Sequence, residues 1–460
     1  MTPTHSLTYT RALGARLLSE ANDLKRTPES MSSELGQPLA HIQAAIAGEL
    51  QPNEYRSLFE NMAKNYPISF GRLWIEPNDT QAGVLHMTVE QSKISSRVFT
   101  RKDRAGQLTP YYEYRDTATS RLSPFRPEWI RELRTVDDAD ANNPDVAYNK
   151  GHFLHQTTLF IGPVNFYWEV NGQRHCAEMD TGDSNYITPF WPHSFASRDS
   201  SKLALIMAVT YGGEVARARE ELARLGPEVL PKLKIEIREK AHAHAALLLR
   251  HLEHEAMSKT RFADFCAGKG IEPSRGLAIL ESKSLPSPAE IVIMAEILNV
   301  SPRDLMPPSV SANEEVVVAH RKDGLKYFYP DESSACYEFT RLARASHQPY
   351  LKSFLLKIFP ERKPAELHVG LHQFIYNCGE ESVNFSSRAQ GEERVVKLAP
   401  GDSAYVTPMT GCRFEADGKN AAELYVVRIP GDMHADAVFE LSSMAPQGLA
   451  RVAKETTRWF

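Results

Sequence analysis

The segment GDSNYITPFWPHSF at residues 182–195 occurs a second time in the chain, as GDSAYVTPMTGCRF at residues 401–414. The two copies align without a gap, and the alignment places His193 of the first copy opposite Cys412 of the second. Both copies keep the Gly-Asp pair and a proline, residues that are typical of turns between strands. The repetition indicates two β-rich halves with the same fold.

A second repeated stretch lies upstream of each copy, where GHFLHQTTLFIG in the first half matches VGLHQFIYNCG in the second. In this match Gln156 falls on Gln373, but His152 falls on Val369. The second half has therefore kept its turn residues and lost two histidines, because His193 is also replaced. A copy that keeps a fold and loses its histidines has discarded a site, so we expect the chemistry in the first half.

Helical patterns precede each β-rich stretch. Residues 12–49 predict short amphipathic helices with a turn at Gly36, and residues 246–283 predict the same arrangement with a turn at Gly270. In both, a helix ends near a glycine and a second helix follows a short turn, which is the pattern of a helix-turn-helix unit. With 460 residues, the chain is long enough for several domains.

The composition is that of a globular protein, with 42% hydrophobic residues, 24% charged residues and a net charge of −5. This balance favours neither a nucleic-acid surface nor a membrane surface. No apolar run approaches the roughly 18 residues of a membrane span. The five cysteines are scattered without paired spacing, which is typical of free thiols in a reducing compartment. We expect a cytoplasmic protein.

The β-rich stretches resemble cupin barrels, because a histidine-bearing strand and a glycine turn are followed by Gly-Asp and Pro-x-x-Pro-His. The predicted fold class is α+β, a tandem repeat of a helix-turn-helix-like helical unit plus a cupin (double-stranded β-helix) barrel. The predicted parts are a helical unit (1–67), a catalytic barrel (68–212), a linker helix with a second helical unit (213–310) and a barrel without metal (311–460).

The strand geometry brings three polar side chains of the first half together. Residues i and i+4 of a strand lie on the same face, so His152 and Gln156 point one way and His155 points the other. His193 comes from a different strand, after the turn at Gly182. Two histidines and one oxygen donor leave metal positions open for substrate and dioxygen, as in non-haem Fe(II) oxygenases. We therefore expect an iron site here.

The residues alone leave the third ligand open. A carboxylate is usual, and the first half offers Glu169, Glu178, Asp180 and Asp183. Asp183 lies in a turn, where Asp commonly binds its own backbone. Glu178 and Asp180 fall in a polar loop, and Glu169 lies on a later strand. Gln156 has the right face and the right spacing from His152, although a buried amide satisfied by its neighbours shows the same pattern.

The tandem arrangement, the NKGH sequence before the first strand and the TGDSxxxxPxxPHS sequence resemble a family that contains 2-hydroxyethylphosphonate dioxygenase and methylphosphonate synthase, with hydroxypropylphosphonate epoxidase as a single-copy relative. The resemblance implies Fe(II), dioxygen and 2-hydroxyethylphosphonate, without 2-oxoglutarate. The dioxygenase has a glutamate six residues before the second histidine, where this chain has Ile187. The synthases have an apolar residue there and a glutamine four residues after the first histidine, where this chain has Gln156.

The resemblance thus implies that His152, Gln156 and His193 bind the metal. It implies cleavage of the carbon–carbon bond of 2-hydroxyethylphosphonate to give methylphosphonate with bicarbonate or carbon dioxide. The alternative is the dioxygenase outcome, hydroxymethylphosphonate and formate. A homo-oligomeric assembly remains open.

Four substrate-binding side chains also follow from the resemblance: Arg104, Tyr112, Asn149 and Lys25. An arginine offers a planar fork of donors to a phosphonate, and tyrosine and asparagine add neutral hydrogen bonds. Tyr111 and Tyr114 flank Tyr112, so the choice among the three tyrosines stays open. Without the resemblance, Arg104 and Lys25 have the pattern of solvated charges.

The helical units raise a function of another class, a cupin-bearing transcription regulator. A recognition helix needs basic or amide side chains and several cations that contact phosphates. Residues 38–50 contain no lysine or arginine, and residues 273–283 contain only Arg275 and Lys283. Because the net charge is also negative, we expect the helical units to form walls and lids of the active site and not to bind nucleic acid.

Overall fold

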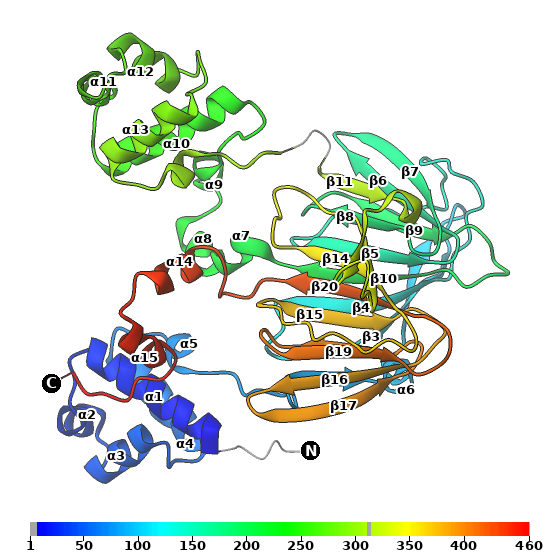
Figure 1. Cartoon of the computed structure of the whole chain (residues 1–460), viewed down its shortest axis with the longest axis horizontal. Helices are drawn as coiled ribbons and strands as arrows, with labels where there is room; N and C mark the ends of the chain where they lie inside the picture. Colours follow the sequence, from blue (N-terminus) through cyan, green and yellow to red (C-terminus); the bar gives the residue numbers. More distant parts are fainter. Residues whose placement is uncertain (1–6, 311–313, 460) are drawn as a thin grey trace.

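The computed structural model describes residues 7–310 and 314–459, and in it two helical units lie along one side of a large β region (Figure 1). The helices of the first unit are α1 (Leu7–Asp23), α2 (Pro28–Leu35), α3 (Leu39–Ala47), α4 (Pro52–Asn65) and α5 (Phe70–Leu73). The predicted turn at Gly36 is confirmed, since Gly36 ends α2 in the left-handed conformation at φ +64°. Thr27 begins the same helix by accepting a hydrogen bond from the Ser30 amide, and Pro28 occupies its first turn.

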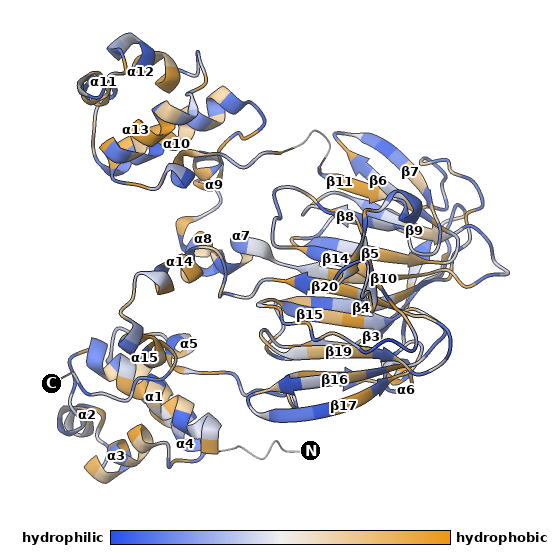
Figure 2. Ribbon diagram, viewed as in Figure 1, coloured by the Kyte–Doolittle hydropathy of each residue, from blue (hydrophilic) through white to orange (hydrophobic). Residues whose placement is uncertain are grey.

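The second helical unit follows the first β-rich stretch. Its helices are α10 (Lys240–His254), α11 (Lys259–Gly268), α12 (Pro273–Leu280), α13 (Pro288–Leu298) and the 3-10 turn η1 (Pro302–Leu305), and short helices α7 (Gly213–Arg217), α8 (Arg219–Leu225) and α9 (Leu230–Leu233) lead into it. Gly270, at φ +89°, makes the predicted turn between α11 and α12. Apolar residues cluster inside each unit, as the orange stripes of Figure 2 show.

The chain ends on the first helical unit. The final segment contains α14 (Asp436–Ser442), the 3-10 turn η3 (Pro446–Gly448) and α15 (Leu449–Ala453). The Asn22 amide donates to the Thr457 carbonyl at 2.9 Å, and its oxygen accepts from the Trp459 amide at 3.3 Å. The two ends of the chain therefore pack together.

The first β unit is a seven-stranded sheet that faces a three-stranded sheet. The strand order of the large sheet is β11-β8-β5-β10-β4-β3-β2, and that of the small sheet is β7-β6-β9. The strands are β2 (Arg97–Lys102), β3 (Leu108–Asp116), β4 (Phe125–Glu132), β5 (His155–Ile161), β6 (Val164–Val170), β7 (Gln173–Met179), β8 (Ser184–Ile187), β9 (His193–Ser197), β10 (Leu205–Tyr211) and β11 (Val316–Ala319). One further helix, α6 (Val89–Ile94), precedes β2.

The second β unit repeats this order. Its large sheet runs β1-β18-β15-β20-β14-β13-β12, and its small sheet runs β17-β16-β19. The strands are β1 (Val84–Met87), β12 (Lys326–Tyr329), β13 (Tyr337–Arg341), β14 (Lys352–Ile358), β15 (His372–Asn377), β16 (Val383–Ala389), β17 (Glu392–Leu398), β18 (Ser403–Val406), β19 (Gly411–Ala416) and β20 (Ala422–Ile429), with the 3-10 turn η2 (Arg321–Asp323) before β12.

The two β units exchange their edge strands. Strand β1 precedes the first unit in the chain but pairs with β18 of the second, whereas β11 precedes the second unit but pairs with β8 of the first. The repeated Gly-Asp-Ser turns hold these strands. Asp402 accepts a hydrogen bond from the Val89 amide at 2.7 Å and contacts His86 at 3.1 Å. Asp183 makes the matching contacts with the Arg321 amide at 2.8 Å and His320 at 3.0 Å.

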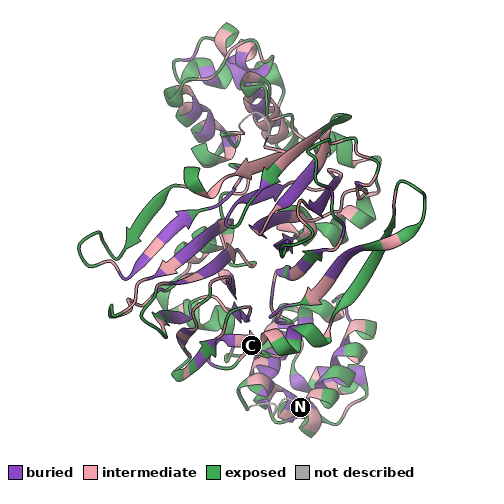
Figure 3. Ribbon diagram, turned by 90° about the vertical axis from the view of Figure 1, so that its right-hand side faces the viewer, coloured by how far each residue is buried: buried purple, intermediate pink, exposed green. Residues whose placement is uncertain are grey.

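The two large sheets pack against each other through their outer faces. The shared core includes Leu159, Tyr186 and Val209 from the first unit and Phe374 and Tyr405 from the second. The opposite face of each large sheet encloses a core of its own, between the large and the small sheet. The central strands are therefore buried on both faces, and Figure 3 shows strands of the β region in purple. Burial on both faces explains why β10 reads as a nearly continuous apolar run.

The prediction of a mixed helix-and-sheet fold is confirmed. Within the described residues no sheet closes on itself, so the cupin barrel stays a prediction, as does the helix-turn-helix character of the helical units. Among the same residues, no helix has the length and apolar character that crossing a bilayer requires.

We expect the Asp402→Asn substitution to lower the free energy of unfolding by about 1.5–3 kcal/mol at neutral pH, because it weakens charge-assisted bonds that hold β1. Burial alone would raise the pKa of Asp402, but the bonds from His86, Val89 and Ala399 outweigh burial and lower this pKa. The stabilisation is thus present at neutral pH and is lost as the pH falls through the lowered pKa. Denaturant unfolding at several pH values measures the difference between variant and wild type.

The matched control is Asp417→Asn, which removes the same charge from an exposed carboxylate that pairs with Lys397. The control should be less destabilising than Asp402→Asn. Equal unfolding free energies for Asp402→Asn and the wild type would contradict the role of Asp402.

Candidate metal centre

Two acceptor atoms face each other where the loop before β5 meets the strand. The His152 Nδ1–H donates to the Leu154 carbonyl at 2.9 Å, which leaves the Nε2 lone pair free, and this Nε2 lies 3.2 Å from Gln156 Oε1. The Gln156 amide nitrogen donates to Thr158 Oγ1 at 3.0 Å, which fixes the amide oxygen toward His152. Two lone pairs at this distance repel unless a cation lies between or beside them, so the pair suits a metal ion.

His193, at the start of β9, completes the group. Its Nδ1–H donates to the Trp191 carbonyl at 2.9 Å, and its ring lies edge-on to the His152 ring with 5.1 Å between centroids. The Asn149 oxygen accepts the His193 and Gly151 amides, so the Asn149 amide nitrogen points to His193 Nε2 at 3.0 Å. Burial lowers the pKa of His193 to about 4, so the ring is neutral. Its Nε2 lone pair accepts a hydrogen bond from the Asn149 amide, which a bound metal would displace.

The four carboxylates that the sequence offered as third ligand lie elsewhere. Glu169 pairs with Arg174, Asp180 pairs with Arg198, Glu178 is exposed, and Asp183 holds β11. Within the part of the chain that the structure describes, no three histidine, cysteine, aspartate or glutamate side chains converge as a metal site.

The residue opposite Gln156 on the neighbouring strand β8 is Ile187, which is fully buried. Because directly opposed residues of antiparallel strands share a face, Ile187 packs beside the amide and offers no ligand atom. The available donors are therefore two neutral imidazoles and one amide oxygen, a nitrogen and oxygen set that can hold Fe(II).

A cavity of about 250 Å³ opens on these three side chains. Its other lining residues are Arg101, Tyr112, Tyr114, Glu128, Ile130, Ala147, Asn149, Leu154, Phe195 and Thr210. The predicted residues Tyr112 and Asn149 thus lie at the cavity, as do the three predicted ligands. Arg101 and Glu128 were not predicted from the sequence, and Tyr114 is one of the three tyrosines among which the sequence left the choice open.

Arg104 and Lys25 lie outside the lining of this cavity. Arg104 is exposed, and its Nε donates to Asp145 at 2.6 Å. Lys25 follows α1, where its ammonium donates to the Asn22 carbonyl at 3.2 Å and lies 4.8 Å from the ring centroid of Trp459. The chain as described here does not bring these two cations to the histidines.

Arg101 and Tyr114 provide the charge and hydroxyl at the cavity. The Tyr112 hydroxyl is already engaged, since it donates to the Phe195 carbonyl at 3.1 Å and accepts the Phe195 amide at 2.9 Å. Tyr114 has no such partner among the described residues, and burial raises its pKa to about 12, an effect that the charge of Arg101 opposes. Arg101 lies on β2, whereas Arg104 lies in the turn between β2 and β3.

Glu128 is the acidic member of the cavity lining. It lies on β4, and burial raises its pKa because the charged carboxylate loses hydration. No pattern in the sequence singles out Glu128 beyond its place in a strand.

The second β unit keeps the backbone of the site without its metal residues. The Phe190 amide donates to the His152 carbonyl at 2.8 Å, and the Met409 amide donates to the Val369 carbonyl at 2.7 Å in the same way. Burial raises the pKa of Cys412 to about 12, which keeps this residue a thiol and a poor metal ligand.

The amide oxygen of the second half binds a side-chain cation. The Gln373 oxygen accepts a hydrogen bond from the Arg428 Nε at 2.9 Å. Arg428 lies opposite Gln373 on the neighbouring strand, and the equivalent residue opposite Gln156 in the first half is Thr210. The guanidinium thus lies beside the glutamine oxygen in the second half, whereas the shorter threonine leaves that space open in the first half.

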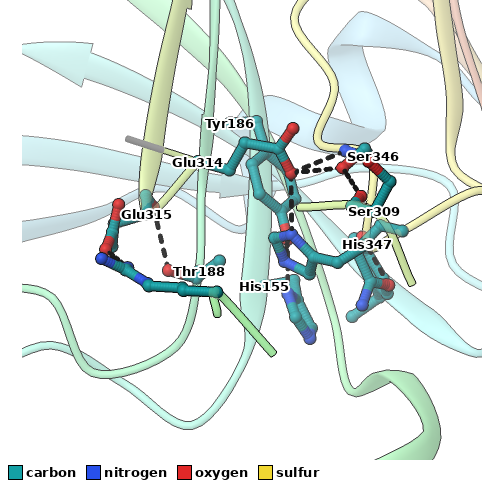
Figure 4. A network of polar contacts seen from close by, with 11 residues as sticks. His155, Tyr186, Thr188, Ser309, Glu314, Glu315, Ser346 and His347 are labelled. Carbon is teal, nitrogen blue, oxygen red and sulfur yellow. Dashed lines mark hydrogen bonds and ion pairs between the residues drawn. The ribbon is translucent and has the colours of Figure 1, made fainter. Parts of the chain in front are cut away.

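His155 serves the packing of the two halves, on the outer face of β5 as predicted. Its Nδ1 lies 2.8 Å from the Tyr186 hydroxyl, which lies 3.1 Å from His347 Nε2. The other nitrogen of His347 lies 3.2 Å from Glu314, and this network connects the first unit to the segment that enters β11 (Figure 4). Both histidines thus belong to the contact between the units.

No protein-family model matches the chain, but individual proteins do. A solved structure of a Streptomyces albus 2-hydroxyethylphosphonate dioxygenase, with that substrate and Fe(II) bound, is 35% identical, covers 99% of this chain and 100% of its own, and superposes with a TM-score of 0.90. A solved variant of 2-hydroxyethylphosphonate dioxygenase that is 18% identical covers 95% of this chain and 99% of its own, with a TM-score of 0.76, and shows the fold alone.

These likenesses place the chain among non-haem iron oxygenases, the class that the two histidines and the open cavity indicate. A methylphosphonate synthase from Nitrosopumilus maritimus (strain SCM1) is 36% identical over 97% of this chain and 95% of its own length. The chain belongs to the family of methylphosphonate synthase and 2-hydroxyethylphosphonate dioxygenase, and the family resemblance seen in the sequence is confirmed.

We expect one iron per chain, bound in the first half, because Val369 and Cys412 stand where His152 and His193 stand. A His193→Ala variant should lose most of its iron, since one imidazole and one amide hold Fe(II) weakly. Metal analysis after anaerobic Fe(II) loading and desalting measures this. The control Cys412→Ala should keep wild-type iron content. Two tightly bound irons per wild-type chain, or full iron in His193→Ala, would contradict the assignment.

Proposed function

We propose that this chain is a methylphosphonate synthase, which uses Fe(II) and dioxygen to cleave the carbon–carbon bond of 2-hydroxyethylphosphonate. The products are methylphosphonate and bicarbonate, and the atoms of substrate and dioxygen balance without 2-oxoglutarate or another reductant. The observation that carries the proposal is Gln156, whose oxygen faces His152 while Ile187 lies opposite. The relative from Nitrosopumilus maritimus, named for the same activity, supports it.

His152, Gln156 and His193 would hold the iron. When bound, Fe(II) supplies the site for dioxygen and the one-electron chemistry that dioxygen requires. The hydrogen bonds from His152 to Leu154 and from His193 to Trp191 orient both rings, so the ligand atoms are held before the metal arrives.

The substrate phosphonate would meet Arg101, Tyr114 and Asn149. A guanidinium matches the oxygen pairs of a phosphonate with parallel donors, and the hydroxyl and amide add neutral donors. We propose Arg101 in place of Arg104 and Tyr114 in place of Tyr112, because these residues line the cavity and keep their polar atoms free for a ligand. Lys25 could serve only after leaving Trp459.

We also propose that each β unit is a cupin and that the chain has four parts, as the sequence predicts. The similar paired sheets of the two units support the tandem repeat. Edge-strand exchange links the parts, so residues 84–87 serve the second cupin and residues 316–319 serve the first. Five free cysteines support a cytoplasmic location.

The assignment is tested by the products. The full chain is loaded with Fe(II) without oxygen, mixed with 2-hydroxyethylphosphonate and exposed to air, and the products are identified by phosphorus and carbon NMR. We expect methylphosphonate and bicarbonate. Hydroxymethylphosphonate and formate as sole products would make the chain a dioxygenase, and unchanged substrate would refute both activities.

Substitution of Gln156 tests the third ligand. Gln156→Ala should lose iron or turnover at least about tenfold, because the site then keeps only two protein ligands. Gln156→Glu should keep iron but turn over more slowly, because the carboxylate adds a negative charge beside the phosphonate. Iron content and initial rates separate these effects. A fully active Gln156→Ala would show that the amide is not a ligand.

Paired arginine variants test the substrate contact. Arg101→Ala should raise KM for 2-hydroxyethylphosphonate by roughly ten- to a hundredfold, the effect of losing one charge-assisted contact of about 1.5–3 kcal/mol. Arg104→Ala, which removes the same charge from the neighbouring surface, should change KM less than about threefold. Iron content should stay unchanged in both. The opposite ranking of the two variants would restore Arg104 as the phosphonate ligand.

A further inference from the structure

The second β unit carries four cations where the first carries one. The equivalence follows from contacts that both units make: the Ala118 amide donates to Ser403 Oγ and the Ala343 amide donates to Ser184 Oγ, each at 2.9 Å. The cations of the second unit, here called the basic cluster, are Arg341, Arg344, Lys352 and Arg428. The residues at these positions in the first unit are Asp116, Thr119, Arg126 and Thr210.

The basic cluster gathers around one aromatic ring. The guanidinium carbons of Arg344 and Arg428 lie 5.0 and 5.2 Å from the centroid of Phe354. Burial raises the pKa of Tyr327 on β12, and the charges of Arg344, Arg428 and Arg341 oppose this rise. Arg341 ends β13, Arg344 lies in the loop that follows, Lys352 begins β14 and Arg428 lies on β20, and these three strands are neighbours in one sheet (Figure 1).

These cations have no carboxylate partner within residues 7–310 and 314–459. Arg344 donates to the Ser353 carbonyl at 3.0 Å, Arg428 donates to the Gln373 amide oxygen, and Lys352 donates to the Pro349 carbonyl. The Nε of Arg344 is buried and has no hydrogen-bond partner at all in the same residues. Burial and the neighbouring guanidiniums lower the pKa of Arg344, which shows that the charges oppose one another.

A cavity of about 580 Å³ opens on Arg341, Arg344 and Lys352. Two carboxylates share its lining, Glu314 and Asp323. Glu314 contacts Ser346 and His347, and its charge and that of Asp323 offset part of the positive charge of the three cations. Arg428 does not line the cavity, but its positive charge is close enough to Arg344 to contribute to the lowering of the Arg344 pKa.

Unpaired, mutually repelling cations around a concave surface are stabilised by a bound anion. Guanidinium forks and an ammonium match the oxygen pairs of a tetrahedral oxyanion. We propose that the cavity, which the second β unit shares with strand β11, binds a small dianion of the phosphate or phosphonate class through Arg341, Arg344 and Lys352. The negative net charge of the chain and the two carboxylates in the lining favour such an ion over a polyanion. This site does not depend on the iron chemistry of the first unit.

Calorimetric titration of the full chain with inorganic phosphate at low ionic strength tests the site. Arg344→Gln should weaken phosphate binding at this site by about tenfold or more, because a charge-assisted contact is lost. Arg388→Gln is the matched control, since Arg388 lies in the same β unit but pairs with Glu366. The control should change affinity less than about twofold. Arg101→Ala, which disables the phosphonate contact of the first unit, should leave one phosphate site per chain.

Three results would overturn the proposal. They are an Arg101→Ala chain that binds no phosphate, an Arg344→Gln chain with wild-type affinity, and equal weakening in Arg344→Gln and Arg388→Gln. Circular dichroism checks the folding of each variant. Should Arg344→Gln fail to fold, Lys352→Gln replaces it with the same expected loss, and wild-type affinity in Lys352→Gln then counts against the site.

Discussion

The packing of two seven-stranded sheets against each other is the constraint on which the rest of the structure depends. This packing buries the central strands on both faces. A shift of one residue in the pairing of such a strand would exchange the side chains of its two faces and would place polar residues in an apolar core. In β5 this register sends His155 to the contact between the units and Gln156 to the interior. The candidate ligand Gln156 is thus oriented by a packing requirement that does not involve a metal.

The interior of the first unit then acts through neutral ligands. Two imidazoles and an amide leave the full positive charge on a bound divalent ion, which attracts a dianionic substrate more strongly than a site with a carboxylate would. Arg101 adds a second positive charge at the cavity, and half-buried Glu128 is the acidic residue of the same lining. In the second unit the Arg428 guanidinium donates to the amide oxygen of Gln373. A side-chain cation therefore contacts the amide oxygen there, where a metal ion would contact it in the first unit.

Internal repeats and strand periodicity in the sequence predicted part of the fold and part of the candidate site. The duplicated Gly-Asp-Ser turns and the closeness of His152 to Gln156 follow from local patterns, although His152 lies in the loop before β5 and not on the strand that the sequence predicted. The partner of a short strand such as VVVA at residues 316–319 cannot be predicted from local patterns. Its pairing with β8 is a long-range contact, and the four apolar residues themselves do not indicate which strand they pair with. Arg101 was missed because RKDR at residues 101–104 offers two arginines, and only the fold shows that Arg101 lines the cavity while Arg104 lies in the following turn.

The exchange of edge strands has a consequence for how the protein is made. Val84 leaves the ribosome early, but its partner Val406 follows more than three hundred residues later. At typical elongation rates that delay is on the order of tens of seconds. During this time β1 is an unpaired strand, and the first large sheet lacks β11, so both present open edges to other nascent chains. Shielding of these edges during translation, more than the stability of the finished fold, would then limit the yield of active protein.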